Sequence, residues 1–461
     1  MQKEWLAFLL PHEWLGKLAA KVKDASLLAT WQGLGPTAQS ECARAAQELQ
    51  CKDLIPLSFW CDAVPYNWDR SQSLEVMNLG MPGVPEWMNL RIPFTCFEHK
   101  RLSANTFEQV FGILIWSLQS LACGEHPLQR HDFLDWLPTD KARQRLAGKP
   151  HGLRAALSVV KADWKAFKEI FHFPGWQGDE GCCWLCKATV QDMRSKPHTA
   201  DMPLDHWSFL RRQKYEYGKP VSTLLAAPTL RVHQFKPDWL HTMDQGCTAD
   251  FLGIFFLWIL LPKMHGRNQT ERIRSLFVLI EEYYAQHPVQ QRYNTLTVKM
   301  LQKKPTSAPK LRGRASEVKG LVLFGKLMAD KYCRDDDLVE HSVKMAAHHL
   351  NNLYTIVSNR ASFSPAAMHT ESFKLRSLLK ALDAHHPQKN MWRLKPKMHL
   401  MEEVCEKAED NPLDSATYRD EDWGGAVARW AKRRAGKNTV ASTAHNVLTK
   451  FCANNKLPDL C

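Results

Sequence analysis

From the sequence we expect neither a membrane-spanning segment nor a signal peptide, and we find no internal repeats or long low-complexity tracts. Its longest apolar stretch, Phe251 to Leu261, is shorter than the roughly 20 residues that a bilayer-spanning helix needs, so a buried helix is predicted there. Without a signal peptide, the 13 cysteines are expected to be reduced thiols in an intracellular compartment. The length of 461 residues allows up to about three domains, and 44% hydrophobic content supports a well-filled core.

Acidic residues are also in deficit. The chain has 48 Asp and Glu against 61 Lys and Arg, a net charge of +13, which favours a polyanionic partner. Two basic segments, residues 302–319 and 429–437, are predicted to contact DNA phosphates without reading sequence. The alternative for the first segment is a solvent-exposed start of a helix, and the alternative for the second is a nuclear-localisation signal. The predicted contacts are Lys303, Lys304, Lys310, Arg312, Arg314, Arg429, Lys432, Arg433, Arg434 and Lys437.

Two aspartates stand at the ends of apolar strands. Asp62 follows the strand that starts at Leu54, and Asp163 follows the strand that starts at Ala155. Between them the pattern predicts strands over 73–81 and 89–97 and an apolar helix over 103–123. A right-handed crossover through this helix would place the fourth strand beside the first, in parallel, with Asp62 next to Asp163. Paired carboxylates there can share divalent cations and activate water for phosphodiester chemistry, although each aspartate alone is also a common helix cap.

This order of elements is that of a ribonuclease-H-like sheet. After Asp163 the sequence predicts a short helix, a strand-like stretch over 229–235, and then mostly helices to about residue 400, among them helices over 269–286 and 292–301. We therefore expect an α/β protein with a ribonuclease-H-like mixed sheet core, interrupted by a large, mostly helical insertion. The expected divisions are an N-terminal helical segment (1–50), the core with a cysteine knuckle (51–250), the helical insertion (251–400) and a C-terminal helical part of the core (401–461).

A cysteine motif follows the second aspartate. Cys183 and Cys186 have the C-x-x-C spacing with which one turn chelates zinc, and Cys182 competes for either position. A second knuckle is missing, so further ligands must come from distant positions. The candidate histidines are His172, His206 and His241, the last in a D-x-x-H motif with Asp238. Buried free thiols are the alternative to a zinc site.

Together these motifs resemble the DDE/D cut-and-paste DNA transposases, close to the CACTA group and its Kyakuja, Dileera and Zisupton relatives. The matching segments are FWCDAVPYNWDRS, VVKADWKAF, CCWLC, the D-x-x-H motif, KPKMHLMEE at 395–403 and YRDEDWGG at 418–425. The resemblance covers about residues 54 to 437. No zinc-finger DNA-binding domain precedes the core, so we expect a truncated or domesticated member.

The resemblance implies a site of two aspartates and one glutamate. Asp62 and Asp163 are the first two acids, and Glu421 is the third, with Asp422, Glu402 and Glu403 as rivals. Mg²⁺ or Mn²⁺ held by these acids would support DNA strand cleavage and strand transfer. The resemblance also assigns Cys183, Cys186 and His241 to a structural zinc cluster. Glu402 and Glu403, beside an apolar helix face, are expected to be solvated or salt-bridged.

The resemblance implies that the partner is DNA and that the protein is nuclear. No membrane association is expected, and a homo-oligomer is possible. Two non-enzymatic alternatives remain. One is a catalytically decayed, domesticated transposase that binds DNA in the nucleus, and the other is a helical, zinc-stabilised interaction protein.

Overall fold

The computed structural model describes residues 8–19, 31, 33–83, 87, 89–175, 181–196, 203–385, 392, 394–432 and 440–454. The chain divides into two compact units. Unit 1 comprises Met1–Gly175, Asp205–Lys236 and Asp414–Cys461, and unit 2 comprises Trp176–Leu204 and Pro237–Leu413. The cysteine motif therefore belongs to the helical unit 2, whereas the expected division grouped it with the strands.

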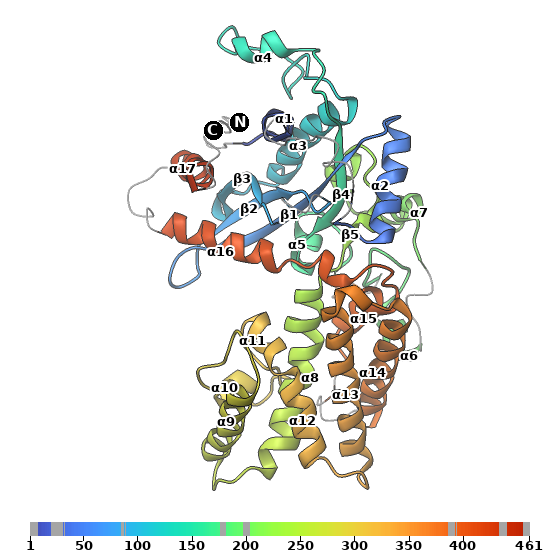
Figure 1. The fold of residues 1–461 in the computed structure, drawn as a ribbon, viewed down its shortest axis with the longest axis vertical. Helices are drawn as coiled ribbons and strands as arrows, with labels where there is room; N and C mark the ends of the chain where they lie inside the picture. The colour runs from blue at the N-terminus through green and yellow to red at the C-terminus, as the bar shows by residue number, and fades with distance from the viewer. Residues whose placement is uncertain are drawn as a thin grey trace. The chain divides into compact units, whose positions relative to one another are not determined.

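Unit 1 is built on a five-stranded mixed sheet of order β3-β2-β1-β4-β5 (Figure 1). β1 pairs with β2, and β2 with β3, in antiparallel fashion, whereas β4 runs parallel to β1 and β5 parallel to β4. The predicted mixed α/β class and the pairing of the first and fourth strands are confirmed. The strands are β1 (Ile55–Pro65), β2 (Ser73–Gly80), β3 (Ile92–Glu98), β4 (Ala155–Lys161) and β5 (Phe235–Lys236).

Helices cover both faces of this sheet (Figure 1). Successive side chains of a strand point to opposite faces, so Phe59 and Trp60 of β1 identify the two sides. Phe59 packs against Phe111 of α3 (Thr106–Cys123), with ring centroids 6.2 Å apart. Trp60 packs with Val427 of α16 (Tyr418–Lys432), in a cluster that also includes α17 (Val440–Asn454). Helices α16 and α17, near the C-terminus, thus complete the hydrophobic core on one face of the first strands.

The remaining helices of unit 1 are short or peripheral. The aromatic rings of Phe167, Phe171 and Phe173, which follow β4, pack with Phe235 of β5. The helices are α1 (Pro11–Ala19), α2 (Pro36–Glu48), α4 (Lys141–Leu146), α5 (Trp164–Glu169) and α7 (His206–Arg211), with a π-helical turn at Arg212–Glu216 and 3-10 turns at His99–Arg101, Thr223–Ala226 and Val232–Gln234.

The strand predicted over 229–235 is mostly wrong, because only Phe235 and Lys236 pair with β4. A 3-10 turn at Val232–Gln234 precedes them. The Gln234 side-chain amide donates to the carbonyls of Leu157 and Ser158 on β4, each at 3.2 Å. A side chain therefore satisfies the backbone groups that a longer fifth strand would have paired.

Unit 2 is helical. Its central run, from Leu240 to Lys263, has the length and the apolar composition of a membrane-crossing helix. However, 72% of the most apolar 18-residue stretch of this run is buried inside the protein. This burial is typical of a core helix and agrees with the predicted buried helix. The helices are α6 (Val190–Ser195), η6 (Leu240–Thr248), α8 (Ala249–Ile254), η7 (Phe255–Leu260), η8 (Leu261–Lys263), α9 (Gln269–Gln286), α10 (Val298–Leu301), α11 (Ala315–Gly320), α12 (Val322–Tyr332), α13 (Leu338–Ser358), η9 (Arg360–Ser362), α14 (Pro365–His385), α15 (Lys397–Met401), η10 (Glu402–Glu406) and η11 (Pro412–Asp414).

The longer predicted helices of unit 2 are confirmed, and a short one is not. The sequence predicts a helix over 292–301, but only Val298–Leu301 is helical. The Tyr293 amide instead donates to the Tyr284 hydroxyl of α9 at 3.2 Å. A tertiary hydrogen bond thus holds the preceding residues in an irregular conformation.

Candidate functional site

Asp62 and Asp163 lie at neighbouring positions on the sheet. The parallel ladder between β1 and β4 ends with Trp60 opposite Lys161. Asp62 is two residues beyond Trp60, and Asp163 is two residues beyond Lys161. Both aspartates therefore lie two residues beyond the last pair of this ladder, on neighbouring parallel strands. Asp163 follows the end of β4 as the sequence predicts, whereas Asp62 is still inside β1, where it pairs with Val76 of β2. Their carboxylates are near enough to the buried Cys61 thiol that, after burial and Glu75, both add to the rise in the pKa of that thiol.

Each of these carboxylates also has a local backbone partner. Asp62 Oδ1 accepts a hydrogen bond from the Ala63 amide at 2.7 Å. Asp163 is the N-cap of α5, where its Oδ1 accepts from the Ala166 amide at 2.6 Å. The capping role that the sequence left open for Asp163 is therefore present, and it uses one carboxylate oxygen. A cap and a metal ligand are compatible, because a carboxylate has two oxygens and about four acceptor sites.

Helix α16, which carries Glu421, lies over the sheet face to which Asp62 belongs. Gly424 makes the close approach, since an added Cβ there would stand 3.1 Å from side-chain atoms of both Trp60 and Val64. These two residues flank Asp62 at alternate positions of β1 and so share its face. Glu421 precedes Gly424 by three residues and is its neighbour on the helix surface. The half-buried Glu421 is thus one helical turn away from Gly424, the residue of α16 that approaches the strand on both sides of Asp62.

The rivals for the third acid have different environments. Asp422 is exposed on α16. Glu402 and Glu403, expected to be solvated or salt-bridged, are 2% and 8% exposed within unit 2 and therefore are not solvated. The salt-bridged alternative is confirmed, since Glu402 lies 3.8 Å from Arg376 and Glu403 lies 3.5 Å from Lys407. Both carboxylates approach the His399 ring, at 3.7 and 3.5 Å. Among these acids, Glu421 alone combines partial burial with a place beside the strand that carries Asp62.

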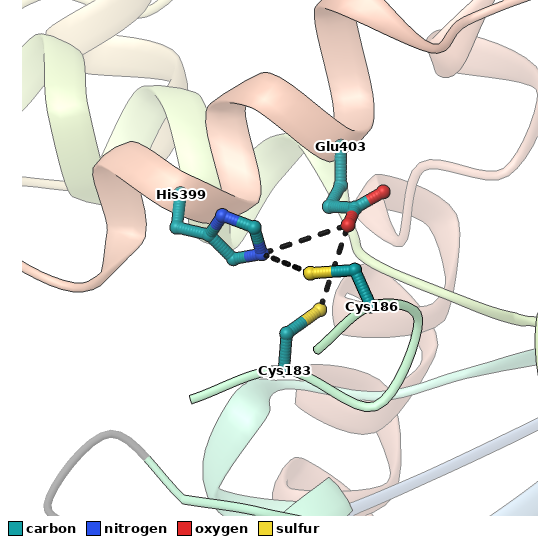
Figure 2. A group of neighbouring side chains, drawn as sticks. All are labelled: Cys183, Cys186, His399 and Glu403. Carbon is teal, nitrogen blue, oxygen red and sulfur yellow. Dashed lines mark hydrogen bonds and ion pairs between the residues drawn. The ribbon is translucent and has the colours of Figure 1, made fainter. Parts of the chain in front are cut away.

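A second group of side chains gathers in unit 2 (Figure 2). Cys183 and Cys186 come from the loop before α6, and His399 and Glu403 come from successive turns of the helix formed by α15 and η10. All four are buried, and one ligand atom from each lies within 4.8 Å of the others. Within the described part of the chain, this is the group suited to hold a metal ion.

The distances in this group match the edges of a zinc tetrahedron. Cys186 Sγ lies 3.3 Å from His399 Nε2, and His399 Nε2 lies 3.5 Å from Glu403 Oε1. Cys183 Sγ lies 3.7 Å from the same Glu403 oxygen. Zinc bonds of about 2.0 to 2.3 Å in tetrahedral geometry place ligand atoms about 3.3 to 3.8 Å apart. The four side chains are therefore arranged around a volume that one zinc ion would fill.

Backbone amides donate hydrogen bonds to both cysteine sulfurs. The Leu185 amide donates to Cys183 Sγ and the Ala188 amide donates to Cys186 Sγ, each at 3.3 Å. Hydrogen bonds from Cys183 and then from His399 lower the pKa of Cys186 to about 6, whereas burial raises the pKa of Cys183 well above its usual value. Burial opposes the charge on His399, but hydrogen bonds to Cys186 and to the two glutamates raise its pKa well above the usual range.

A further layer of charged groups orients His399. Its Nδ1 faces the Glu402 carboxylate at 3.7 Å, on the opposite side of the ring from the cysteines. Glu402 lies 3.8 Å from the buried Arg376 guanidinium, which binds Glu406 at 2.8 Å. A carboxylate behind the second ring nitrogen is the usual way in which proteins orient a metal-binding histidine.

The other zinc candidates lie in different contacts. The predicted ligand His241 directs Nδ1 to Asp238 at 2.7 Å, and His399 stands beside the cysteines in its place. His172 contacts Glu108 at 3.3 Å, and His206 Nδ1 accepts from the Val232 amide at 3.2 Å. The Cys182 thiol donates to the Ala188 carbonyl at 3.6 Å. The H-x-x-x-E spacing of His399 and Glu403, which puts both on one helix face, is the sequence signal that would have found them.

The basic segments are only partly described. Lys303, Lys304, Arg312 and Arg314 are exposed, as phosphate contacts must be. Lys310 differs, because its Nζ donates to the Gln245 carbonyl and burial lowers its pKa. We therefore leave Lys310 out of the predicted phosphate contacts. In the second segment Arg429 is exposed, and the side chains of Lys432, Arg433, Arg434 and Lys437 lie outside the described residues.

Comparison with known proteins adds no assignment. A scan against protein-family models finds no match, and a search of the curated proteins finds none either. The arguments for function therefore rest on the geometry of the two groups of side chains.

Proposed function

We propose that this chain is a transposase-like protein that performs metal-dependent DNA strand cleavage and strand transfer on a ribonuclease-H-like core. The observation that carries the proposal is the placement of Asp62 and Asp163 on adjacent parallel strands, each two residues beyond the last pair of the ladder. The packing of α16 over the same face supports Glu421 as the third acid. The larger segment of the helical unit 2, Pro237–Leu413, lies between β5 and α16, which supports an insertion ahead of that acid.

The chemistry follows from two divalent ions held by three carboxylates. Mg²⁺ or Mn²⁺ held there would lower the pKa of an attacking water or 3′-hydroxyl and stabilise the leaving oxygen. Asp62, between the other two acids in the proposed arrangement, would contact both ions. Asp163 and Glu421 would each hold one. The role of the protein is to keep these oxygens at fixed separations on rigid elements.

The substitution Asp163→Asn distinguishes a catalytic role of Asp163 from its role as a helix cap. Asparagine caps a helix about as well as aspartate, so we expect the melting temperature to change little, while Mg²⁺- or Mn²⁺-dependent nicking of supercoiled plasmid is lost. Asp163→Ala is the comparison, since it removes the cap as well and should cost a further ~1 kcal/mol of stability. Nicking by the Asn variant at the wild-type rate would leave Asp163 as a cap alone and favour the decayed, non-enzymatic alternative.

DNA binding is expected to depend on the exposed basic residues of unit 2. Changing Lys303, Lys304, Arg312 and Arg314 together to glutamine should reduce the slope of log affinity against log salt by about 0.9 per lost phosphate contact. The measurement is a gel shift at several salt concentrations. Lys326→Gln with Lys344→Gln is the control, because these lysines pair with Asp330 and Asp335. No salt-dependent shift by the wild type would favour the interaction-protein alternative.

We further propose that unit 2 contains a structural zinc held by Cys183, Cys186, His399 and Glu403. Two thiolates, one imidazole and one carboxylate fill all four tetrahedral positions, which leaves none for substrate and marks the site as structural. Because the ligands come from two segments about 200 residues apart in the sequence, the ion would tie the loop before α6 to the helix of α15 and η10. Its removal should therefore affect the folding of unit 2 before it affects chemistry.

A further inference from the structure

Asp420 is a buried carboxylate in the first turn of α16, immediately before Glu421, and it has no exposed surface. Its Oδ1 accepts from Arg91 Nε at 2.5 Å, and its Oδ2 accepts from Lys161 Nζ at 2.8 Å. The side chains of Lys161 and Arg91 are 4% and 8% exposed. Ions removed from water to this degree persist only with close, well-aligned partners. Each oxygen of Asp420 therefore already forms an ion pair with a cationic side chain of the protein.

The three residues come from parts of the chain that meet at the proposed active site. Lys161 ends β4, two residues before Asp163, and Arg91 immediately precedes β3. Asp420 lies near the start of the segment, Asp414–Cys461, that returns to the sheet after unit 2. Sequence proximity cannot set the place of Glu421, which follows Asp163 by 258 residues. The ion pair to Lys161 supplies that link, because it joins the first turn of α16 to the strand that leads into Asp163.

A second contact fixes the rotation of the helix. Gly424 lies four residues after Asp420 and on the same face of α16, where it meets Trp60 and Val64 of β1. A helix held at two points of one face cannot turn about its axis. Glu421 is displaced by about 100° from Asp420 around that axis, so its direction is set by the same two contacts.

We propose that Asp420 is the positioning residue for the third metal ligand, and that its ion pairs with Lys161 and Arg91 hold Glu421 at the metal-binding edge of the sheet. Asp420 itself is not a metal ligand in this proposal, because two buried cations of the protein, Arg91 and Lys161, already balance its charge. The inference rests on the proposed function of Asp62, Asp163 and Glu421. It explains why an aspartate adjoins the third acid and why a lysine lies two residues before the second.

The test compares Asp420→Asn with the wild type in plasmid nicking at a series of Mn²⁺ concentrations. Loss of a residue that orients a metal ligand typically costs 10- to 100-fold in metal affinity. We therefore expect the half-saturating Mn²⁺ concentration to rise at least about tenfold, with a smaller change in the rate at saturating metal. Lys161→Gln, which keeps the Arg91 pair, should give a smaller shift and serves if Asp420→Asn does not fold.

Leu118→Ala is the control for general loss of stability. Leu118 is 1% exposed on α3, which covers the opposite sheet face. It should lower the melting temperature while leaving the half-saturating Mn²⁺ concentration at the wild-type value. An equal shift in Leu118→Ala, or no shift in Asp420→Asn, would overturn the positioning role.

Direct Mn²⁺ binding separates this inference from the proposed activity. Electron paramagnetic resonance counts bound Mn²⁺, and the difference between wild type and Asp62→Asn isolates the ions of the carboxylate site. Weaker binding at that site in Asp420→Asn supports the positioning role even if the wild type does not nick DNA, a result that would overturn the activity alone. Equal Mn²⁺ binding by wild type and Asp62→Asn would overturn both.

Discussion

Cys186→Ser should remove one zinc ion per chain and markedly lower the thermal stability of unit 2. Structural zinc sites bind with apparent free energies of about 10 to 16 kcal/mol in small zinc domains, and that binding energy is folding energy. Here the Cys186 thiol lies 3.3 Å from His399 Nε2, so a serine there removes a ligand from a completed set. Elemental analysis of the purified protein and thermal unfolding with and without a chelator measure the two effects.

The chain offers matched controls for this experiment. Cys182→Ser changes the neighbouring buried cysteine, which bonds to the Ala188 carbonyl and lies outside the cluster. His241→Ala removes the histidine that pairs with Asp238, whereas His399→Ala removes the one beside the cysteines. We expect zinc to be retained in Cys182→Ser and His241→Ala and lost in His399→Ala. A wild type without zinc, or loss of zinc in His241→Ala with retention in His399→Ala, would reject the proposed ligand set.

Glu421→Gln is expected to lower metal-dependent nicking by about 10³-fold or more, because a metal ligand contributes to several kcal/mol of transition-state stabilisation. The change removes one charge and almost no volume, so fold and non-specific DNA affinity should be nearly unchanged. The assay is plasmid nicking at saturating Mn²⁺, with circular dichroism and a gel shift as checks on fold and binding.

Asp422→Asn is the matched control for Glu421→Gln. Asp422 is the next residue on the same helix and is exposed. It should keep wild-type nicking if Glu421 is the third acid. Full activity in Glu421→Gln with loss in Asp422→Asn would move the third ligand by one position and change which face of α16 meets the metals.

The long, strongly periodic elements were predictable from the sequence. The apolar run of 103–123 and the helix over Gln269–Gln286 form as expected. The prediction over 229–235 failed because the Gln234 side chain takes the place of strand pairing. Local pattern cannot show that a distant side chain will satisfy the backbone of a neighbouring strand, which is a tertiary event.

The two groups of site residues differ in the same way. The sequence placed Asp62 and Asp163 beside each other, because strand order and crossover handedness follow from local pattern and chain chirality. It found Cys183 and Cys186 from their spacing and proposed His241 as a further ligand, while His399 was not among the candidate histidines. His399 lies more than 200 residues beyond the cysteines, and spacing carries no information at that range.

By itself the sequence determined the first four strands, the placement of Asp62 and Asp163 on neighbouring strands, the thiol pair and the excess of positive charge, since each depends on neighbours within a few residues or on simple connection rules. Only the tertiary structure decided that His399 and Glu403 face the thiols and that Asp420 ties α16 to Lys161. Those contacts join segments separated by hundreds of residues, and packing of buried side chains brings them together.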